Sequence, residues 1–413
     1  MPPYDAVSSR AGQRYGPVTA EGAAHWVTMG VPARARIDLD AISANVALLR
    51  DYAGGADVMA MVKAEAYGHG LAPAARAALA GGATWLGVAK LAEALRLREE
   101  GVTGVRTLVC IGVPGEPYEQ AIAADIDLAA GSVWLVQEIA EAAARAGRPA
   151  RVHLKADTGM SRGGAAPDDW PALVQAALAA EASGHVRVVG LMSHLACADE
   201  VGHPSIGRQV AAFREMVEHA EAAGLRPEVR HIANSAATLT LPEARFDLVR
   251  PGIATYGLTP VPQLGDFGLR PAMTLVADAA LVKRVPAGSG ISYGHTYVTE
   301  RETTLAVVPV GYGDGVPRHG SNLLEVLAGG RRRRIAGRVC MDQFVIDLGD
   351  DTLTPGDEVV LFGPGDHGEP TAQEWADALG TISYEIVTRI GSRVPRVYAG
   401  RPAARPHEGV RHG

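Results

Sequence analysis

The stretch VMAMVKAEAYGHG (residues 58–70) decides how the fold is interpreted, because it joins a strand to a helix through a glycine-rich turn. Val58–Val62 form an apolar run typical of a buried strand, and the alanine-rich run that starts at Leu71 predicts a helix. Lys63 stands where the strand ends. A buried ammonium costs several kcal/mol unless it is paired, so such a lysine tends to lose its proton. The neutral amine can then form a Schiff base with a carbonyl cofactor. The alternative interpretation is that Lys63 extends its charged end from the strand into water, which would be favoured for a lysine without the surrounding motif.

The same alternation of strand and helix continues to about Gly257 and predicts parallel β/α units. Eight apolar runs predict the strands, namely Val58–Val62, Trp85–Val88, Thr107–Ile111, Leu128–Ala130, Val152–Ala156, Val188–Ser193, His231–Asn234 and Leu248–Arg250. Alanine-rich segments between them predict helices at Leu71–Leu79, Ala92–Glu99, Val133–Ala146, Trp170–Glu181 and Ile206–Ala223. Eight such units in this length fit an α/β fold of the (β/α)8 TIM-barrel type.

After residue 257 the pattern changes to a mainly-β domain with one helix at Thr371–Leu379. Its predicted strand runs are Met273–Val282, Thr303–Val310, Phe344–Leu348 and Val359–Phe362. We therefore expect a barrel over residues 36–257 and a C-terminal β domain over 258–402. Residues 1–35 lack periodicity and are expected to be a disordered leader, with Met29 as a candidate true start; residues 403–413 are expected to be a tail.

Composition excludes several classes of protein. Hydrophobic residues make up 47% and charged residues 21%, as in ordinary globular chains, and the net charge of -7 does not favour a nucleic-acid partner. Cys110, Cys197 and Cys340 are too far apart for a metal-ligand motif and predict core residues in a reducing compartment. The basic run Arg331–Arg334 predicts a solvated hairpin. There is no membrane-length apolar run and no export signal in the sequence, so we expect a cytoplasmic protein without a membrane partner.

The ends of the last two barrel strands carry groups suited to phosphate. In a barrel, phosphate often binds after strands seven and eight. Ser235 offers a hydroxyl there, the amides of Gly252 and Ile253 can point at an anion, and Tyr67 can add a phenol. A simple turn glycine at position 252 is an equally good interpretation of that residue alone.

Together the motifs resemble the bacterial alanine racemase family from about Arg36 to Tyr398. They occur in family order as KAEAYGHG, KADTGMSR, HIANSAA, RPGIATYG, ISYGHTY, VGYGDGVPR, GRVCMDQF and ISYEIVTRIGSRVPRVY. The resemblance implies a pyridoxal 5'-phosphate (PLP) enzyme with a barrel and a β domain, interconverting L-alanine and D-alanine for peptidoglycan synthesis. It further implies that Lys63 holds PLP and acts as one of two bases.

The resemblance also implies the cofactor's other contacts. The phosphate contacts it predicts are Tyr67, Ser235, Gly252, Ile253 and Tyr384, and Asn234 and His194 complete the cofactor site. Arg250 matches the arginine that hydrogen-bonds the pyridine nitrogen. An arginine cannot release its proton and has no acceptor, so the ring nitrogen stays unprotonated and the cofactor is a weaker electron sink.

Tyr293 matches the second base, because racemisation requires proton transfer on both faces of the α-carbon. In the family this tyrosine comes from the partner subunit and is contacted by the histidine that His194 matches, so the resemblance implies a head-to-tail homodimer. Without the other motifs, Tyr293 would be interpreted as a packing residue of the β domain.

The remaining implied roles concern the substrate. Arg162 is suited to bidentate capture of a carboxylate, and Met341 matches a residue whose backbone amide meets it. Lys155 matches a lysine that is carbamylated in some members, although an ordinary lysine is an equal alternative. The supporting and entrance residues that we predict are His231, Tyr312, Asp342 and Arg318, with a structural turn as the alternative for Asp342.

One residue departs from the family pattern: Glu65 stands where an asparagine or aspartate is more usual. Three other functions remain open at this point. A barrel-type PLP decarboxylase would release carbon dioxide, and a binding protein that sequesters an alanine-like inhibitor such as cycloserine would differ only in kinetics. A small PLP-homeostasis protein would lack the second domain.

Overall fold

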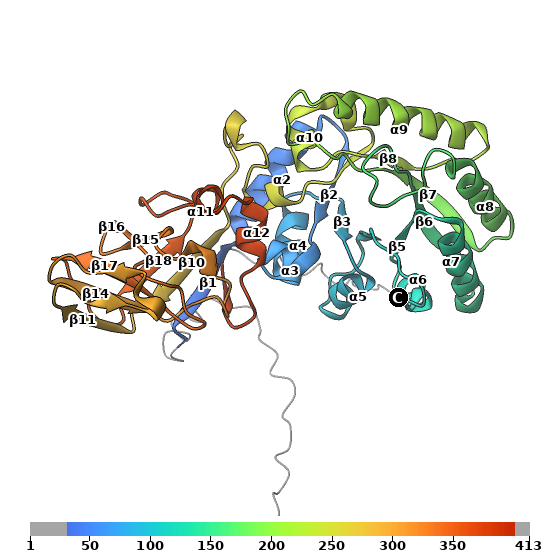
Figure 1. The fold of residues 1–413 in the computed structure, drawn as a ribbon. Coiled ribbons are helices and arrows are strands. Elements are labelled where there is room, and N and C mark those ends of the chain that lie inside the picture. The colour runs from blue at the N-terminus through green and yellow to red at the C-terminus, as the bar shows by residue number, and fades with distance from the viewer. Residues whose placement is uncertain (1–30, 401–413) are drawn as a thin grey trace, which may run out of the picture.

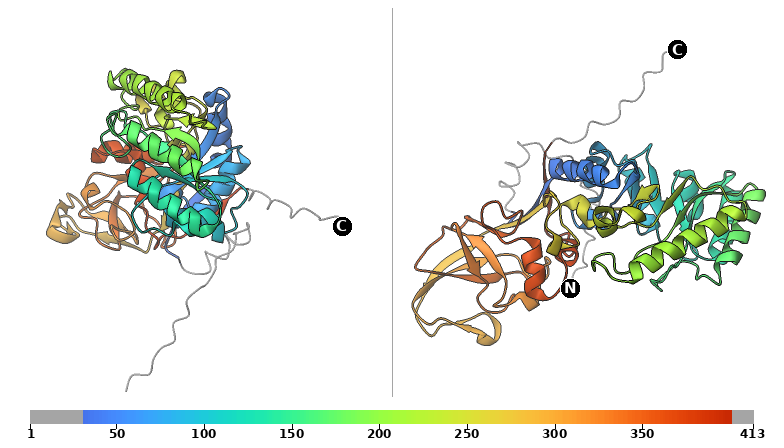
Figure 2. Two further views of the ribbon diagram at one scale, coloured as in Figure 1. Left: turned by 90° about the vertical axis from the view of Figure 1, so that its right-hand side faces the viewer. Right: turned by 90° about the horizontal axis from the view of Figure 1, so that it is seen from above.

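The computed structural model describes residues 31–400, so the expected start at Met29, most of the expected leader and the expected tail lie outside the described residues. Two bodies of structure are visible, a barrel ringed by helices and a β domain beside it (Figure 1). Viewed from above, the β domain lies at one side of the barrel (Figure 2). Among residues 31–400 no helix is long and apolar enough to cross a membrane.

Eight parallel strands form the barrel in the order β8-β7-β6-β5-β4-β3-β2-β9. Their bounds are β2 Asp57–Met61, β3 Trp85–Val88, β4 Arg106–Val109, β5 Asp127–Ala130, β6 Ala150–Lys155, β7 Val186–Met192, β8 Val229–His231 and β9 Leu248–Val249. Backbone hydrogen bonds close the remaining gap, from Asp247 N–H to the Arg230 carbonyl (3.1 Å) and from Arg250 N–H to the Ala233 carbonyl (2.9 Å). The predicted (β/α)8 barrel is therefore confirmed.

The helices around and beside the strands include those expected and several that are shorter. Their bounds are α2 Leu39–Ala53, α3 Lys63–Tyr67, α4 Leu71–Ala80, α5 Leu91–Glu99, α6 Tyr118–Ala123, α7 Val133–Ala146, α8 Trp170–Ala182, α9 Ser205–Ala222, α10 Ser235–Thr240, α11 Ala372–Leu379 and α12 Ser383–Thr388. Six of the eight predicted strands extend past the observed carboxyl ends, and four of the residues beyond those ends, Cys110, Ile111, Asn234 and Arg250, line the cavity described below.

The β domain is built from three sheets. Their orders are β16-β15-β18-β10-β1-β19, β11-β14-β17 and β12-β13. The bounds are β1 Ala33–Asp38, β10 Met273–Asp278, β11 Leu281–Val285, β12 Gly290–Ile291, β13 Tyr297–Val298, β14 Thr303–Val308, β15 Glu325–Ala328, β16 Arg331–Arg334, β17 Phe344–Gly349, β18 Glu358–Phe362 and β19 Arg396–Ala399. The hairpin expected at the arginine run is confirmed as β15–β16.

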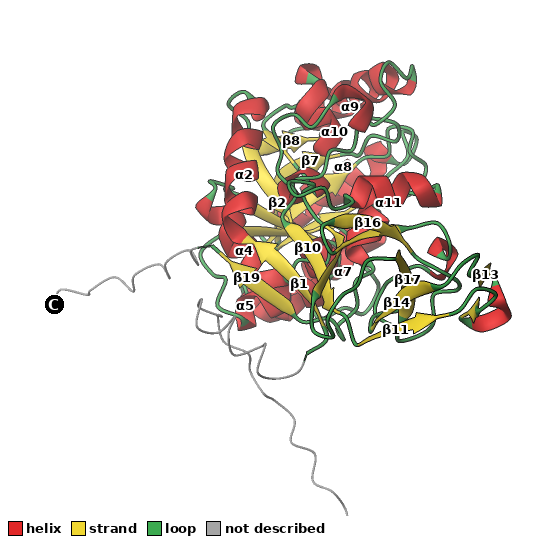
Figure 3. Ribbon diagram, turned by 90° about the vertical axis from the view of Figure 1, so that its left-hand side faces the viewer, coloured by secondary structure: helices red, strands yellow, loops and turns green. Residues whose placement is uncertain are grey.

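Two predictions about strands were wrong. Residues 33–38 were divided between the leader and the barrel, but they form β1, which pairs with β10 and β19 in the β domain (Figure 3). The single run expected over Met273–Val282 is two strands, β10 and β11, in different sheets. In both cases the alternation of apolar and polar residues predicts that a strand forms, but it does not predict which strand it pairs with.

Candidate active site

All eight barrel strands send residues from their carboxyl ends into one cavity of about 620 Å³. Ten of the predicted site residues line it: Lys63, Tyr67, Lys155, Arg162, His194, Asn234, Ser235, Arg250, Gly252 and Tyr384. This is the end of a (β/α)8 barrel where active sites are found.

Lys63 enters the cavity from a backbone turn of unusual geometry. The four residues that follow it, Ala64–Tyr67, all have φ between 52° and 56°, the left-handed region. Each non-glycine residue there costs roughly 1–2 kcal/mol. The turn places the Lys63 Nζ 5.9 Å from the centre of the Tyr67 ring, and that ring lies 6.1 Å from the ring of Tyr384. The turn thus places Lys63 and Tyr67 in the cavity that Tyr384 of α12 also lines.

Part of the cavity lies around Ser235, at the start of α10. The Ser235 Oγ accepts hydrogen bonds from Gly252 N–H (2.8 Å) and Ala254 N–H (3.4 Å). A Cβ atom at position 252 would lie 2.1 Å from the Tyr67 hydroxyl, so only glycine fits there. Ile253 is buried beside this pocket without lining the cavity, and Asn234 also caps α10 by accepting from Ala237 N–H at 3.1 Å.

Arg250 is buried and held by a chain of hydrogen bonds. Its Nη1 donates to His231 Nδ1 (2.8 Å), and its Nη2 donates to the Ser193 carbonyl (2.7 Å) and to His194 Nδ1 (3.2 Å). Because His231 accepts at Nδ1, its neutral tautomer carries the proton on Nε2. Burial lowers the pKa of Arg250 to about 10, so the guanidinium remains charged at neutral pH.

The chain of hydrogen bonds behind Arg250 continues to two residues that were not predicted from the sequence as site residues, His153 and Asp127. His231 Nε2 lies 2.9 Å from His153 Nδ1, and His153 Nε2 lies 3.3 Å from the buried Asp127 carboxylate. Burial raises the pKa of Asp127, but hydrogen bonds from His153 and Arg106 outweigh this effect and the net shift is downward. The signal available in the sequence was the polar His153 within the predicted strand Val152–Ala156.

Burial governs the other ionisable groups of the cavity. It lowers the pKa of His194 to about 3, with Arg250 acting in the same direction. It also lowers the pKa of Lys155, which lies near Arg250 and Arg162. Cys110 was expected to be a core residue but lines the cavity, and burial raises the pKa of its thiol. The cavity therefore holds a neutral histidine among cationic groups.

Apart from Tyr384, the β-domain residues predicted for the site lie outside this cavity. Tyr293, Tyr312, Met341 and Asp342 do not line the cavity. Tyr293 is 71% exposed and Met341 is 53% exposed. Asp342 accepts a hydrogen bond from Arg393 at 2.7 Å.

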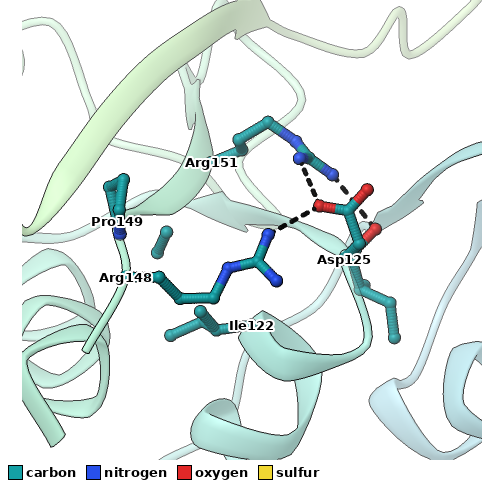
Figure 4. A pocket seen from close by; sticks show the side chains of 7 residues that line it. Ile122, Asp125, Arg148, Pro149 and Arg151 are labelled. Atoms are coloured by element: carbon teal, nitrogen blue, oxygen red, sulfur yellow. Dashed lines mark hydrogen bonds and ion pairs between the residues drawn. The ribbon is translucent and has the colours of Figure 1, made fainter. Parts of the chain in front are cut away.

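A second hollow, of about 10 Å³, lies at the amino ends of β5 and β6. Arg148 and Arg151 both point at the Asp125 carboxylate there (Figure 4). The two cations are already paired with this acid, so the hollow offers little to a ligand.

Comparison with known proteins identifies the family. Residues 37–260 match "Alanine racemase, N-terminal domain" and residues 272–398 match "Alanine racemase, C-terminal domain". The alanine racemase of Thermobifida fusca is 63% identical over 368 residues, covering 89% of this chain and 98% of that protein.

Solved structures agree with the sequence relatives. The alanine racemase of Streptomyces coelicolor superposes with a TM-score of 0.89 at 60% identity, covering 91% of this chain and 100% of the other. An alanine racemase of Bartonella henselae, described with covalently bound pyridoxal phosphate, has a TM-score of 0.80 at 29% identity and covers 89% of this chain and 99% of the other. The chain belongs to the alanine racemase family.

Proposed function

We propose that this enzyme interconverts L-alanine and D-alanine with PLP, using Lys63 and Tyr293 as bases on opposite faces of the α-carbon. Family membership places the protein among alanine racemases, whose general role is to supply D-alanine for peptidoglycan. The observation that carries the proposal is the meeting of Lys63, Arg250 and the pocket around Ser235 in one cavity.

The residues present fit PLP. The cofactor's phosphate requires a pocket of hydrogen-bond donors, which Ser235, the backbone at Gly252, Tyr67 and Tyr384 would supply. Its pyridine nitrogen requires one partner, and Arg250 remains charged and can only donate. When bound, PLP supplies the carbonyl that takes up the amino acid and the conjugated ring that accepts electron density from it.

Each proposed protein group then has one task. Lys63 holds the cofactor and moves a proton on one face of the α-carbon, and Tyr293 moves a proton on the other face. Arg162 would hold the substrate carboxylate in bidentate fashion, with the Met341 amide as a second contact. Neutral His194 would contact Tyr293. Because His194 Nδ1 accepts from Arg250, its proton is on Nε2, which could donate a hydrogen bond to the phenol oxygen and so favour the ionised, basic form of the tyrosine.

The exposure of Tyr293 supports a shared site. A base that is 71% exposed and outside the cavity of its own chain cannot reach Lys63 there. We therefore propose a head-to-tail homodimer, in which Tyr293 and Met341 of each subunit complete the cavity of the other.

The test of function is a chiral assay of purified, PLP-loaded protein. Starting from either enantiomer of alanine, the mixture should approach equal amounts of both, because their free energies are equal. Carbon dioxide release would favour a decarboxylase instead. Tight cycloserine binding without turnover would favour inhibitor sequestration.

A further inference from the structure

The left-handed turn after Lys63 is held from outside by helix α5. Four successive non-glycine residues, Ala64–Tyr67, occupy a backbone region that L-amino acids avoid, so the turn requires contacts that compensate its strain. Hydrogen bonds within the turn, such as Gly68 N–H to the Ala64 carbonyl at 3.0 Å, close it. On either side, Val62 N–H donates to the Gly87 carbonyl of β3 and Arg396 donates to the Gly68 carbonyl, both at 2.8 Å.

Glu93 ties the start of the turn itself to helix α5. Its Oε1 accepts a hydrogen bond from Ala64 N–H at 2.6 Å, and its Oε2 accepts from Ala89 N–H at 2.9 Å and Lys90 N–H at 3.0 Å. One half-buried carboxylate thus joins the backbone after β2 to the backbone after β3. Hydrogen bonds to an ionised acceptor are about twice as strong as neutral ones.

A second contact lies one helical turn further along α5. The Arg96 guanidinium binds the Glu65 carboxylate through two nitrogens, one of them at 2.9 Å. The two side chains are 43% and 52% exposed, so the pair adds little to stability by itself. It does show what Glu65 contacts: the acid that departs from the family pattern reaches Arg96.

We infer that Glu93 is a positioning residue for Lys63, and that the Glu65–Arg96 pair is a weaker, outer hold on the same turn. The inference rests on the proposed role of Lys63 as cofactor lysine and base. The N–H of Ala64 belongs to the peptide plane that begins at the Lys63 carbonyl. Holding that plane restricts rotation about ψ of Lys63, and so restricts the direction in which the side chain leaves the backbone.

Proton transfer is sensitive to such direction, because a misplacement of about 1 Å can cost about 100-fold in rate. Glu93→Gln removes the charge and leaves one good acceptor for three N–H donors. We expect kcat to fall about 10- to 100-fold. Glu65→Asn should have a smaller effect in the same direction. Glu99→Gln, on the exposed face of the same helix, is the matched control and should behave as wild type.

Two measurements separate positioning from a general loss of structure. The first is amide hydrogen exchange of the protein, which should become at least about tenfold faster at residues 62–68 in Glu93→Gln and remain unchanged in the β domain. The second is the α-deuterium kinetic isotope effect in both directions of racemisation. Slowing only the Lys63 step should raise the isotope effect for the enantiomer that Lys63 deprotonates and lower it for the enantiomer that Tyr293 deprotonates.

Equal isotope effects in wild type and Glu93→Gln, or unchanged exchange at residues 62–68, would overturn the inference. A kcat that falls with both isotope effects changed equally would also overturn it, since that result indicates only a structural role. The exchange measurement needs no turnover. If wild-type protein failed to racemise alanine, the proposed function would be wrong. The exchange measurement would still show whether Glu93 holds the turn at residues 62–68.

Discussion

At the scale of single residues, pairing between two strands explains how the chemistry is assembled. Lys63 follows β2 and Arg250 follows β9, and these two strands are paired in the barrel. The proposed cofactor lysine and the proposed partner of the pyridine nitrogen are therefore neighbours by strand pairing, although 187 residues separate them in the sequence (250 − 63). The hydrogen-bond chain through His231 and His153 then fixes the direction of Arg250.

Replacing Lys63 with alanine tests the cofactor assignment. The visible absorption of lysine-bound PLP should disappear, and borohydride reduction should no longer attach the cofactor to the chain. Racemisation should fall by at least about 100-fold, the lower end of what one acid–base group contributes. A retained, reducible band would place the covalent link on another lysine.

His69 predicts a pH dependence of stability. It is fully buried, its Nδ1 donates to the Ala66 and Tyr67 carbonyls, and burial lowers its pKa to about 4. In the unfolded chain the histidine has a pKa near 6.5, so between about pH 6.5 and pH 4 it is protonated in the unfolded state and neutral in the folded state. The contribution of His69 to the free energy of unfolding is therefore fully present above about pH 6.5 and is lost as the pH drops toward about 4.

Urea unfolding measures this effect. From about pH 7.5 to about pH 5.5, His69 alone should remove roughly 1.4 kcal/mol from the free energy of unfolding. His69→Gln should flatten the pH profile by that amount, whereas His219→Gln, at an exposed position of α9, should not. Equal profiles for all three proteins would contradict the assignment.

At the scale of elements, the sequence predicted what is local and missed what depends on distant partners. The eight barrel strands and the long helices were predictable from periodicity, and the residues of the cavity from motifs that end those strands. Strand β1 was not, because its partners β10 and β19 lie more than 200 residues away along the chain. The contact between Glu93 and Ala64 was likewise hidden, since 29 residues separate the two.

The position of β1 in the β domain predicts the effect of a core substitution. Ile37 is 0% exposed between β10 and β19. Ile37→Ala should lower the free energy of unfolding by about 2–5 kcal/mol, through lost burial and the cavity left behind. Val298→Ala, at a side chain that is 51% exposed, should change it by less than about 0.5 kcal/mol. Similar small losses for both variants in urea unfolding would contradict the placement of β1.

At the scale of the whole molecule, the barrel carries a cavity and the β domain carries exposed residues that the cavity lacks. A shared site predicts complementation between two inactive variants. Lys63→Ala and Tyr293→Phe, co-expressed with different tags and purified as mixed dimers, should contain one site with both wild-type bases. Such dimers should recover about half of wild-type activity. Mixed dimers as inactive as either parent would contradict exchange of Tyr293 between subunits.

The proposed enzyme uses two bases that move protons on opposite faces of the α-carbon of alanine. The most direct test incubates PLP-loaded enzyme with L-alanine or D-alanine in deuterium oxide, and reads deuterium at the α-carbon and product chirality in the same sample. We predict that each enantiomer yields its mirror image carrying α-deuterium. Recovery of alanine with neither inversion nor deuterium would contradict the account.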